Sequence, residues 1–187
     1  MELLSIKNMV CPRCIATVER LLVHQSIDYT KIVLGTVTLS NPLTDAQREE
    51  LAQSFKEVGF ELLSTPEEQL TNQIKSLIVD HIHYQDKQVN QNWSDILVAA
   101  LHKDYSTLSK TFSKATDLTI EYYIILQKIE RAKELLQNNE WTISQIAVAL
   151  GYSSTAHFSA QFKKIVGETA SQFKKQADGK RHFLDKF

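Results

Sequence analysis

The chain has 187 residues and a mass of 21.4 kDa, and its 43% hydrophobic and 23% charged residues are typical of a folded protein and exclude a disordered one. No stretch approaches the roughly 18 consecutive apolar residues that a membrane-spanning helix needs, and residues 1–7 lack the pattern of a signal peptide, so we expect a cytoplasmic protein. The net charge of −1 gives no bulk support for nucleic-acid binding. The charge is uneven, however, because residues 1–65 carry six basic and eight acidic side chains and residues 103–187 carry thirteen and nine. This asymmetry permits a DNA-facing C-terminal part.

Residues 1–64 show strand and helix patterns in alternation. In chain order these are a strand ending at residues 8–10, a helix from Pro12, two strands at 31–34 and 36–39 that turn at Gly35, a helix capped by Thr44 with Gln47, and a strand at 60–62. The order βαββαβ predicts a ferredoxin-like domain with two helices on one face of a four-stranded sheet. The positions expected to be buried are Leu4, Ile6, Ile15, Val18, Leu21, Leu22, Leu51, Phe55 and Val58.

The rest of the chain has helical patterns alone. Residues 64–69 contain Pro66 and two glutamates and are a predicted linker. A helix through Ile74 and Ile78 follows, before the polar stretch 85–92. Residues 70–178 are therefore expected to form an all-α domain, and the chain as a whole is expected to be an α+β protein.

An internal repeat of 50 residues lies in this helical part. Positions 94–119 contain eight identities with positions 144–169, where about one or two are expected by chance. The identical residues of the first copy are Ser94, Ile96, Val98, Ala99, Ser109, Phe112, Lys114 and Thr119. We infer that one supersecondary unit has been duplicated.

Each copy is predicted to be a helix-turn-helix, at residues 93–116 and 142–166. In the second copy Thr142 and Gln145 form a capping box, Gly151 supplies the turn and Ser153 is expected to cap the second helix. In the first copy the expected cap is Asp104. The apolar stripes are Leu108, Phe112 and Ala115 in the first copy, and Ile143, Ile146, Ala147, Leu150, Phe158, Phe162 and Ile165 in the second.

A single helix is predicted to join the two copies over residues 119–137, with Ile125, Ile129, Ala132 and Leu136 on its buried side. At about 1.5 Å per residue this linker helix would be roughly 28 Å long. Successive major grooves on one face of DNA lie about 34 Å apart, so one chain could place two helices in adjacent grooves.

The second helix of each copy has a polar face opposite its apolar stripe. Lys110 is the best candidate to contact guanine, and Lys164 is expected to contact phosphate. The alanines of the second copy are expected either to touch thymine methyl groups or to leave that helix with mainly shape and phosphate contacts. The alternative is a helical bundle whose polar faces are merely solvated. The candidate DNA-binding residues are Ser106, Ser109, Lys110, Ser113, Thr155, Ala156, His157, Ala160, Gln161, Lys163 and Lys164.

The segment from Glu140-Trp-Thr-Ile-Ser-Gln-Ile-Ala to Phe173 resembles the signature of the AraC/XylS transcription regulators, and residues 129–136 resemble the end of that family's linker helix. The resemblance covers about residues 72–176. It implies a seven-helix domain with two helix-turn-helix units, promoter DNA as the ligand and the transcription machinery as a partner. It places base contacts at Ser106, Ser109, Lys110, Ala156, His157 and Ala160. The sequence departs from the family at Ala160, at Ala170, where proline is usual, and at Lys174, where arginine is usual.

The two cysteines, Cys11 and Cys14, are three residues apart at the predicted junction of the first strand and helix. A helix N-terminus favours thiolates, and two soft ligands at this spacing can bind Cu(I) or supply half of a Zn(II) site. The segment Met9-Val-Cys-Pro-Arg-Cys14 resembles the metal loop of heavy-metal-associated domains, over about residues 1–64. Asn8 and Val10 differ from that loop, which usually has glycine and a small hydroxyl residue there. A redox pair and a scaffold without metal are the alternatives.

The sequence shows no pattern typical of a catalytic site, because it has no Ser-His-Asp set, no paired carboxylates and no phosphate-binding glycine loop. We therefore expect that the protein is not an enzyme and that it requires no cofactor. His81 and His83 point to different sides of a helix, and His24, His102 and His182 have no ligand partner at a suitable spacing. The leading hypothesis is a sequence-specific DNA-binding transcription regulator that responds to a soft metal at Cys11 and Cys14. The alternative is a soft-metal trafficking or buffering protein whose helical half docks a protein partner.

Overall fold

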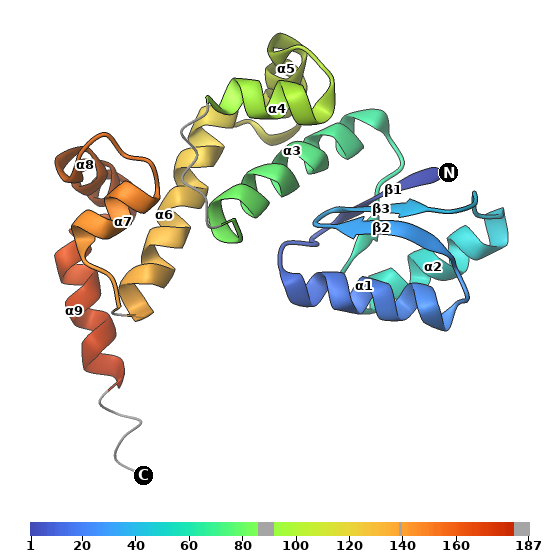
Figure 1. Cartoon of the computed structure of the whole chain (residues 1–187), viewed down its shortest axis with the longest axis horizontal. Coiled ribbons are helices and arrows are strands. Elements are labelled where there is room, and N and C mark those ends of the chain that lie inside the picture. Colours follow the sequence, from blue (N-terminus) through green and yellow to red (C-terminus); the bar gives the residue numbers. More distant parts are fainter. Residues whose placement is uncertain (86–91, 139, 182–187) are drawn as a thin grey trace. The chain divides into compact units, whose positions relative to one another are not determined.

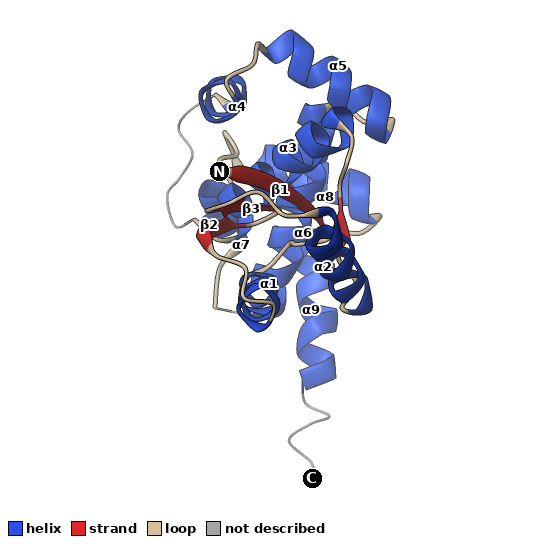
Figure 2. Ribbon diagram, turned by 90° about the vertical axis from the view of Figure 1, so that its right-hand side faces the viewer, coloured by secondary structure: helices blue, strands red, loops and turns tan. Residues whose placement is uncertain are grey.

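A computed structural model describes residues 1–85, 92–138 and 140–181. Within this part of the chain the strands are confined to the first 62 residues and every later element is a helix (Figure 2). Residues 1–80 and 93–119 form one compact unit, and the described residues of 81–92 and 120–187 form a second. None of the described helices is long and apolar enough to cross a bilayer.

The first unit contains an antiparallel sheet of β1 (Glu2–Lys7), β2 (Tyr29–Val33), β3 (Thr36–Leu39) and β4 (Glu61–Leu62), in the order β2-β3-β1-β4. Because side chains alternate along a strand, Leu4, Ile6, Val37 and Leu39 share one face of the sheet. They are buried there with side chains of α1 (Pro12–His24) and α2 (Asp45–Glu57). Two helices therefore cover one face of the sheet, as predicted (Figure 1).

The opposite face of the sheet packs against α3 (Pro66–His83). A helix through Ile74 and Ile78 was predicted, but its packing on the sheet was not. The side-chain amide nitrogen of Asn72 lies 3.1 Å from three acceptors, which are Ser5 Oγ and the carbonyl oxygens of Ile6 and Gly35. Gly35 has a φ of +73°, and a Cβ on it would lie 2.0 Å from Ser76 Oγ. We call this contact between α3 and the β2–β3 turn, formed by Ser5, Ile6, Gly35, Asn72 and Ser76, the α3 seam.

The predicted linker at residues 64–69 is wrong, because α3 already begins at Pro66. Thr65 Oγ1 accepts a hydrogen bond from the backbone N–H of Glu68, and the Glu68 carboxylate accepts one from the N–H of Thr65. This is a capping box with proline in the first helical position. The division of the chain into domains at residues 1–64 and 70–178 stays a prediction.

The first helix-turn-helix consists of α4 (Trp93–Leu101) and α5 (Tyr105–Thr116) and belongs to the first unit. Leu97, Leu108 and Phe112 are fully buried in it. Near the end of α5, Lys114 Nζ lies 2.8 Å from Glu67 Oε1 in the first turn of α3. The helix α3 thus contacts both the sheet and the first helix-turn-helix.

The second unit consists of α6 (Ile120–Asn138), α7 (Ile143–Ala149), α8 (Thr155–Val166) and α9 (Ala170–Arg181), together with the end of α3. The linker helix is confirmed as α6, within one residue at each end. The hydrophobic core of the second unit contains Ile129 and Ala132 of α6 together with Phe158 and Phe162 of α8. His83, at the end of α3, lies 3.1 Å from Gln127 Oε1 and 3.5 Å from Glu134 Oε2 of α6.

Several local predictions need correction. Ser154 rather than Ser153 caps α8, because its hydroxyl accepts the N–H of His157 and the helix begins at Thr155. Val58 is 43% exposed, because it follows the last residue of α2. Ala115 is also exposed rather than buried. The first strand ends at Lys7, because Asn8 takes a φ of +69°, and β2 begins at Tyr29.

Candidate functional site

The two helix-turn-helix units keep the 50-residue repeat in three dimensions. The helices α5 and α8 are both 12 residues long, and their caps Asp104 and Ser154 stand 50 positions apart. The left-handed residues that end them, Asp117 and Gly167, keep the same spacing. The inference of a duplicated unit is therefore confirmed down to the caps. We refer to α5 and α8 as the recognition helices.

The outer face of α5 is polar. Leu108 and Phe112 anchor the opposite side of the helix in the core, so Ser106 and Lys110 are exposed, whereas Ser109 and Ser113 are half-buried. Of the four residues predicted on this face, Ser106 and Lys110 are thus the most accessible. The long Lys110 side chain has the greatest reach into a groove.

The two recognition helices differ in charge at their N-termini. The Asp104 carboxylate accepts hydrogen bonds from the hydroxyl of Thr107 at 2.7 Å and from its backbone N–H at 2.9 Å, and these bonds lower the pKa of Asp104. An anionic cap at this position repels phosphate. The cap of α8 is the neutral hydroxyl of Ser154, so the positive end of that helix is left open to an anion.

Lys114 and Lys164 occupy equivalent positions of the repeat but have different surroundings. Lys114 is paired with Glu67, as described above. Lys164 lies exposed in the last turn of α8, next to exposed Lys163. The second recognition helix therefore presents two adjacent cations at its end, which suits contact with a phosphate backbone.

The outer face of α8 is less polar than that of α5. Thr155, Ala156, His157 and Ala160 are exposed, whereas Gln161 is half-buried and its Oε1 accepts the hydroxyl of Tyr152 at 2.7 Å. Ser153 Oγ lies 3.4 Å from His157 Nδ1, and the Tyr152 ring meets the His157 ring edge-on at 5.5 Å. His157 and Gln161 are thus held in place from the turn before the helix.

Tyr152 was not singled out from the sequence, although it fixes the turn of the second unit. Its ring also packs edge-on against Phe158, and Lys128 Nζ of α6 lies 5.2 Å from the ring centre. Burial raises the pKa of Tyr152 to about 12, so its hydroxyl keeps its proton at neutral pH, and burial lowers the pKa of Lys128. The only sequence signal was an aromatic residue directly after Gly151. The contact with Lys128 depends on the tertiary fold.

The cysteine pair lies where β1 leads into α1. Cys11 is the N-cap residue of α1, Pro12 takes the first helical position, and the N–H of Cys14 donates to the Cys11 carbonyl at 2.9 Å. The two Sγ atoms are 3.0 Å apart, which is longer than the disulfide length of about 2.05 Å, so both cysteines are free thiols. Asn8 Nδ2 donates to the Gly59 carbonyl at 3.0 Å and ties this loop to the end of α2.

The two thiols differ in acidity. The hydrogen bond from Cys14 lowers the pKa of Cys11, whereas burial raises the pKa of Cys14. Met9 is fully buried in the core of the sheet and its sulfur is therefore unsuited to join the pair as a ligand. Among the described residues no group of three or more metal-binding side chains comes together. The cysteine loop therefore offers two soft donors.

Comparison with known proteins identifies the helical part. Residues 97–176 match a family model described as a helix-turn-helix domain. The Msm operon regulatory protein of Streptococcus mutans is 33% identical over 106 residues, which are 56% of this chain and 36% of that protein. The HTH-type transcriptional activator RhaR of Mannheimia succiniciproducens is 30% identical over 69 residues, which are 37% of this chain and 25% of that protein.

The fold of a solved structure agrees with these matches. The C-terminal domain of AraT, a response regulator from Geobacillus stearothermophilus, is similar with a TM-score of 0.51 and 22% identity, over 60% of this chain and 86% of that domain. The chain spans about a third of the first curated relative and a quarter of the second. Residues 97–176 therefore form a helix-turn-helix domain, and the relatives that share it are transcription regulators rather than enzymes.

Proposed function

We propose that the protein is a sequence-specific transcription regulator of the AraC type, whose recognition helices α5 and α8 bind double-stranded promoter DNA. The observation that carries this proposal is the duplicated helix-turn-helix, with matching caps and an outward polar face on each second helix. A solvated bundle would not need two such helices at the same positions of a repeat.

The two helices are proposed to play different parts. Lys110 and Ser106 of α5 would read base edges, because they are exposed at the middle and start of that helix. In α8 the exposed alanines offer no hydrogen bonds, so His157 would supply base contact, while Lys163 and Lys164 hold phosphate. We also propose that a single chain reads two adjacent major grooves and that the bound protein contacts the transcription machinery.

Lysine variants test these roles. With a duplex selected from random DNA, Lys110→Ala should lower specific affinity by about 1 to 3 kcal/mol and relax the preference at one base pair. Lys164→Ala should weaken specific and random DNA alike and reduce the salt slope by about one. Lys114→Ala is the matched control on α5, because its partner is Glu67, and it should leave affinity within about twofold. Equal losses for Lys110→Ala and Lys114→Ala would contradict the assignment.

We further propose that Cys11 and Cys14 bind a soft metal ion, with Cu(I) favoured over Zn(II). The residues present fit Cu(I), because a pair of thiols suffices for a two-coordinate soft ion, whereas zinc usually takes four ligands. The partly exposed position of both thiols at the start of α1 leaves them accessible to an incoming ion. The order of strands and helices in residues 1–64 is also the one expected of a heavy-metal-associated, ferredoxin-like domain.

The structure suggests how such a metal would influence DNA binding. Ser5 and Ile6, which contact Asn72 in the α3 seam, lie on the strand that leads directly into the cysteine loop. The helix α3 in turn pairs with α5 through Glu67 and Lys114. A metal affects DNA affinity only if it binds the free and DNA-bound forms with different affinity.

Replacing both thiols by serine tests the metal proposal. Cys11→Ser with Cys14→Ser should abolish Cu(I) binding and leave the DNA affinity of the metal-free protein within about threefold, because changes in exposed loops are usually small. A metal-dependent shift of about fivefold in DNA affinity, present in the wild type and absent in the double variant, is the expected result. Retention of Cu(I) by the double variant would refute the site.

A further inference from the structure

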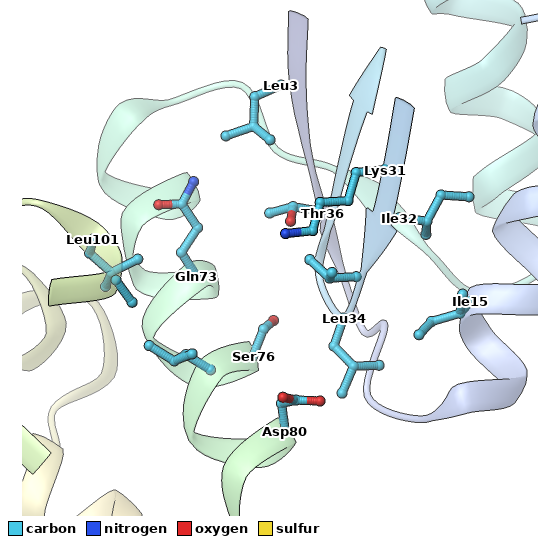
Figure 3. A pocket seen from close by; sticks show the side chains of 13 residues that line it. Leu3, Ile15, Lys31, Ile32, Leu34, Thr36, Gln73, Ser76, Asp80 and Leu101 are labelled. Carbon is cyan, nitrogen blue, oxygen red and sulfur yellow. The ribbon is translucent and has the colours of Figure 1, made fainter. Parts of the chain in front are cut away.

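A cavity of about 500 Å³ lies within the first unit, on the α3 side of the sheet (Figure 3). Its walls come mainly from β2, the β2–β3 turn, β3, α3 and the end of α4, and Leu3 of β1 and Ile15 of α1 lie at its edge. Lys31 and Thr36 of the sheet face Gln73 and Ser76 of α3 across it. This volume falls in the range of about 300 to 1,000 Å³ that is usual for small-molecule sites.

Much of the cavity wall is apolar and accessible. Leu3 is 51% exposed and Val33 is 40% exposed, although both are large aliphatic side chains. Leu34, Leu77 and Leu101 line the same space. An apolar ligand body would remove these surfaces from water, which is favourable in proportion to the area covered.

The polar groups in the wall have free hydrogen-bonding capacity. The side chains of Lys31, Thr36, Gln73 and Ser76 make no hydrogen bond or ion pair with any other residue in the part of the chain that the structure describes. Asp80, which also lines the space, already takes part in an interaction within the chain. The ammonium group of Lys31 is therefore the charge that remains for a ligand.

We propose that this cavity binds an amphipathic organic anion, with its anionic group at Lys31 and its apolar body against Val33, Leu77 and Leu101. The hydroxyl and amide groups of Ser76 and Gln73 are placed to bind polar substituents of the ligand. This chemistry differs from that of the cysteine loop, whose two cysteines do not line the cavity.

The ligand would act on DNA binding through α4. Ala100 and Leu101 end the first helix of the first helix-turn-helix and form one wall of the cavity, while the other walls are the sheet and α3. A ligand that contacts all of these walls stabilises one arrangement of the first unit. This regulatory role rests on the proposed DNA-binding function, whereas ligand binding does not.

A pair of matched dyes tests the site on the full chain. 8-Anilinonaphthalene-1-sulfonate is an amphipathic anion, and N-phenyl-1-naphthylamine has the same rings without the sulfonate. Lys31→Gln should weaken the sulfonate dye about tenfold and the neutral dye less than about twofold. Lys56→Gln, on α2, is the control and should change neither. Because the sulfonate dye also binds loosely packed states, the near-UV circular dichroism of Lys31→Gln and Lys56→Gln must match that of the wild type.

A blocking variant and a DNA titration complete the test. Ala100→Trp, at an exposed wall residue, should abolish binding of both dyes. Unchanged dye affinity in both Lys31→Gln and Ala100→Trp would overturn the site, whatever the protein does with DNA. Saturating sulfonate dye should shift the affinity for a selected duplex by at least about fivefold in the wild type and not in Lys31→Gln. Dye binding without that shift would overturn the regulatory role, and failure of the dye-free protein to bind DNA would instead overturn the proposed function.

Discussion

Replacing Gly35 by alanine would test the α3 seam, which joins the sheet to the helical part of the first unit. An alanine would have to keep a φ of +73°, which costs about 1 to 2 kcal/mol. Its Cβ would also lie 2.0 Å from Ser76 Oγ, 2.9 Å from Ser76 Cβ and 3.0 Å from Asn72 Nδ2. Rotation of the serine hydroxyl relieves the first contact but leaves the other two. Overpacking of this kind costs typically about 1 to 3 kcal/mol, so the total loss should be roughly 2 to 5 kcal/mol.

A double-mutant cycle with Ser76→Gly separates the two terms. Removing the serine side chain leaves the backbone cost of the alanine and removes most of the steric cost, so Gly35→Ala should cost only about 1 to 2 kcal/mol in that background. The assay is denaturant unfolding, combined with hydrogen exchange of the Ile6 amide, which donates to the Gly35 carbonyl at 2.8 Å. An equal cost of Gly35→Ala in both backgrounds would refute the packing of α3 on the β2–β3 turn.

Three further predictions concern other parts of the chain. Thr142→Ala removes the capping box of α7, in which the Gln145 N–H donates to Thr142 Oγ1 at 3.2 Å, and should lower unfolding free energy by about 1 kcal/mol, measured by denaturant titration. Ala132→Pro places a proline in the buried interior of α6, at a cost of about 3 kcal/mol or more, and should expose the amides of α6 to hydrogen exchange while those of the sheet stay protected. Iodoacetamide at pH 7.5 should alkylate Cys11 before Cys14, because the lower pKa of Cys11 gives more thiolate, and peptide mapping should show this preference shrinking as the pH rises and Cys14 also ionises.

Local sequence signals predicted most of the elements. The capping boxes at Thr44 and Thr142 lie where the spacing to a glutamine three residues later placed them, because a cap is formed by neighbouring residues alone. The same signal at Thr65 and Glu68 begins α3, although the proline between these two residues is also typical of a linker. The shift from Ser153 to Ser154 shows the limit of this approach, because two adjacent serines are equally good caps.

Contacts between distant residues could not be predicted in this way. Asn72 meets Gly35 and Ser5 across more than 30 residues of sequence, and nothing in the helical pattern of α3 indicates that its polar face packs on a sheet. The packing of Tyr152 against Lys128 likewise depends on how α6 crosses the turn of the second unit. Helical periodicity alone predicted that the candidate DNA-binding residues share one face of a helix. The hydrogen bond from the Tyr152 hydroxyl to Gln161 could be identified only from the tertiary structure.

The most direct measurement of the central proposal is the affinity of the full chain for a duplex selected from random DNA, compared with a scrambled duplex of equal composition at the same salt concentration. Two recognition helices that read bases should favour the selected duplex by at least about 10³-fold, with equally spaced contacts in two major grooves seen by footprinting. Equal affinity for the two duplexes, or failure of selection to enrich any sequence, would contradict sequence-specific DNA binding by α5 and α8.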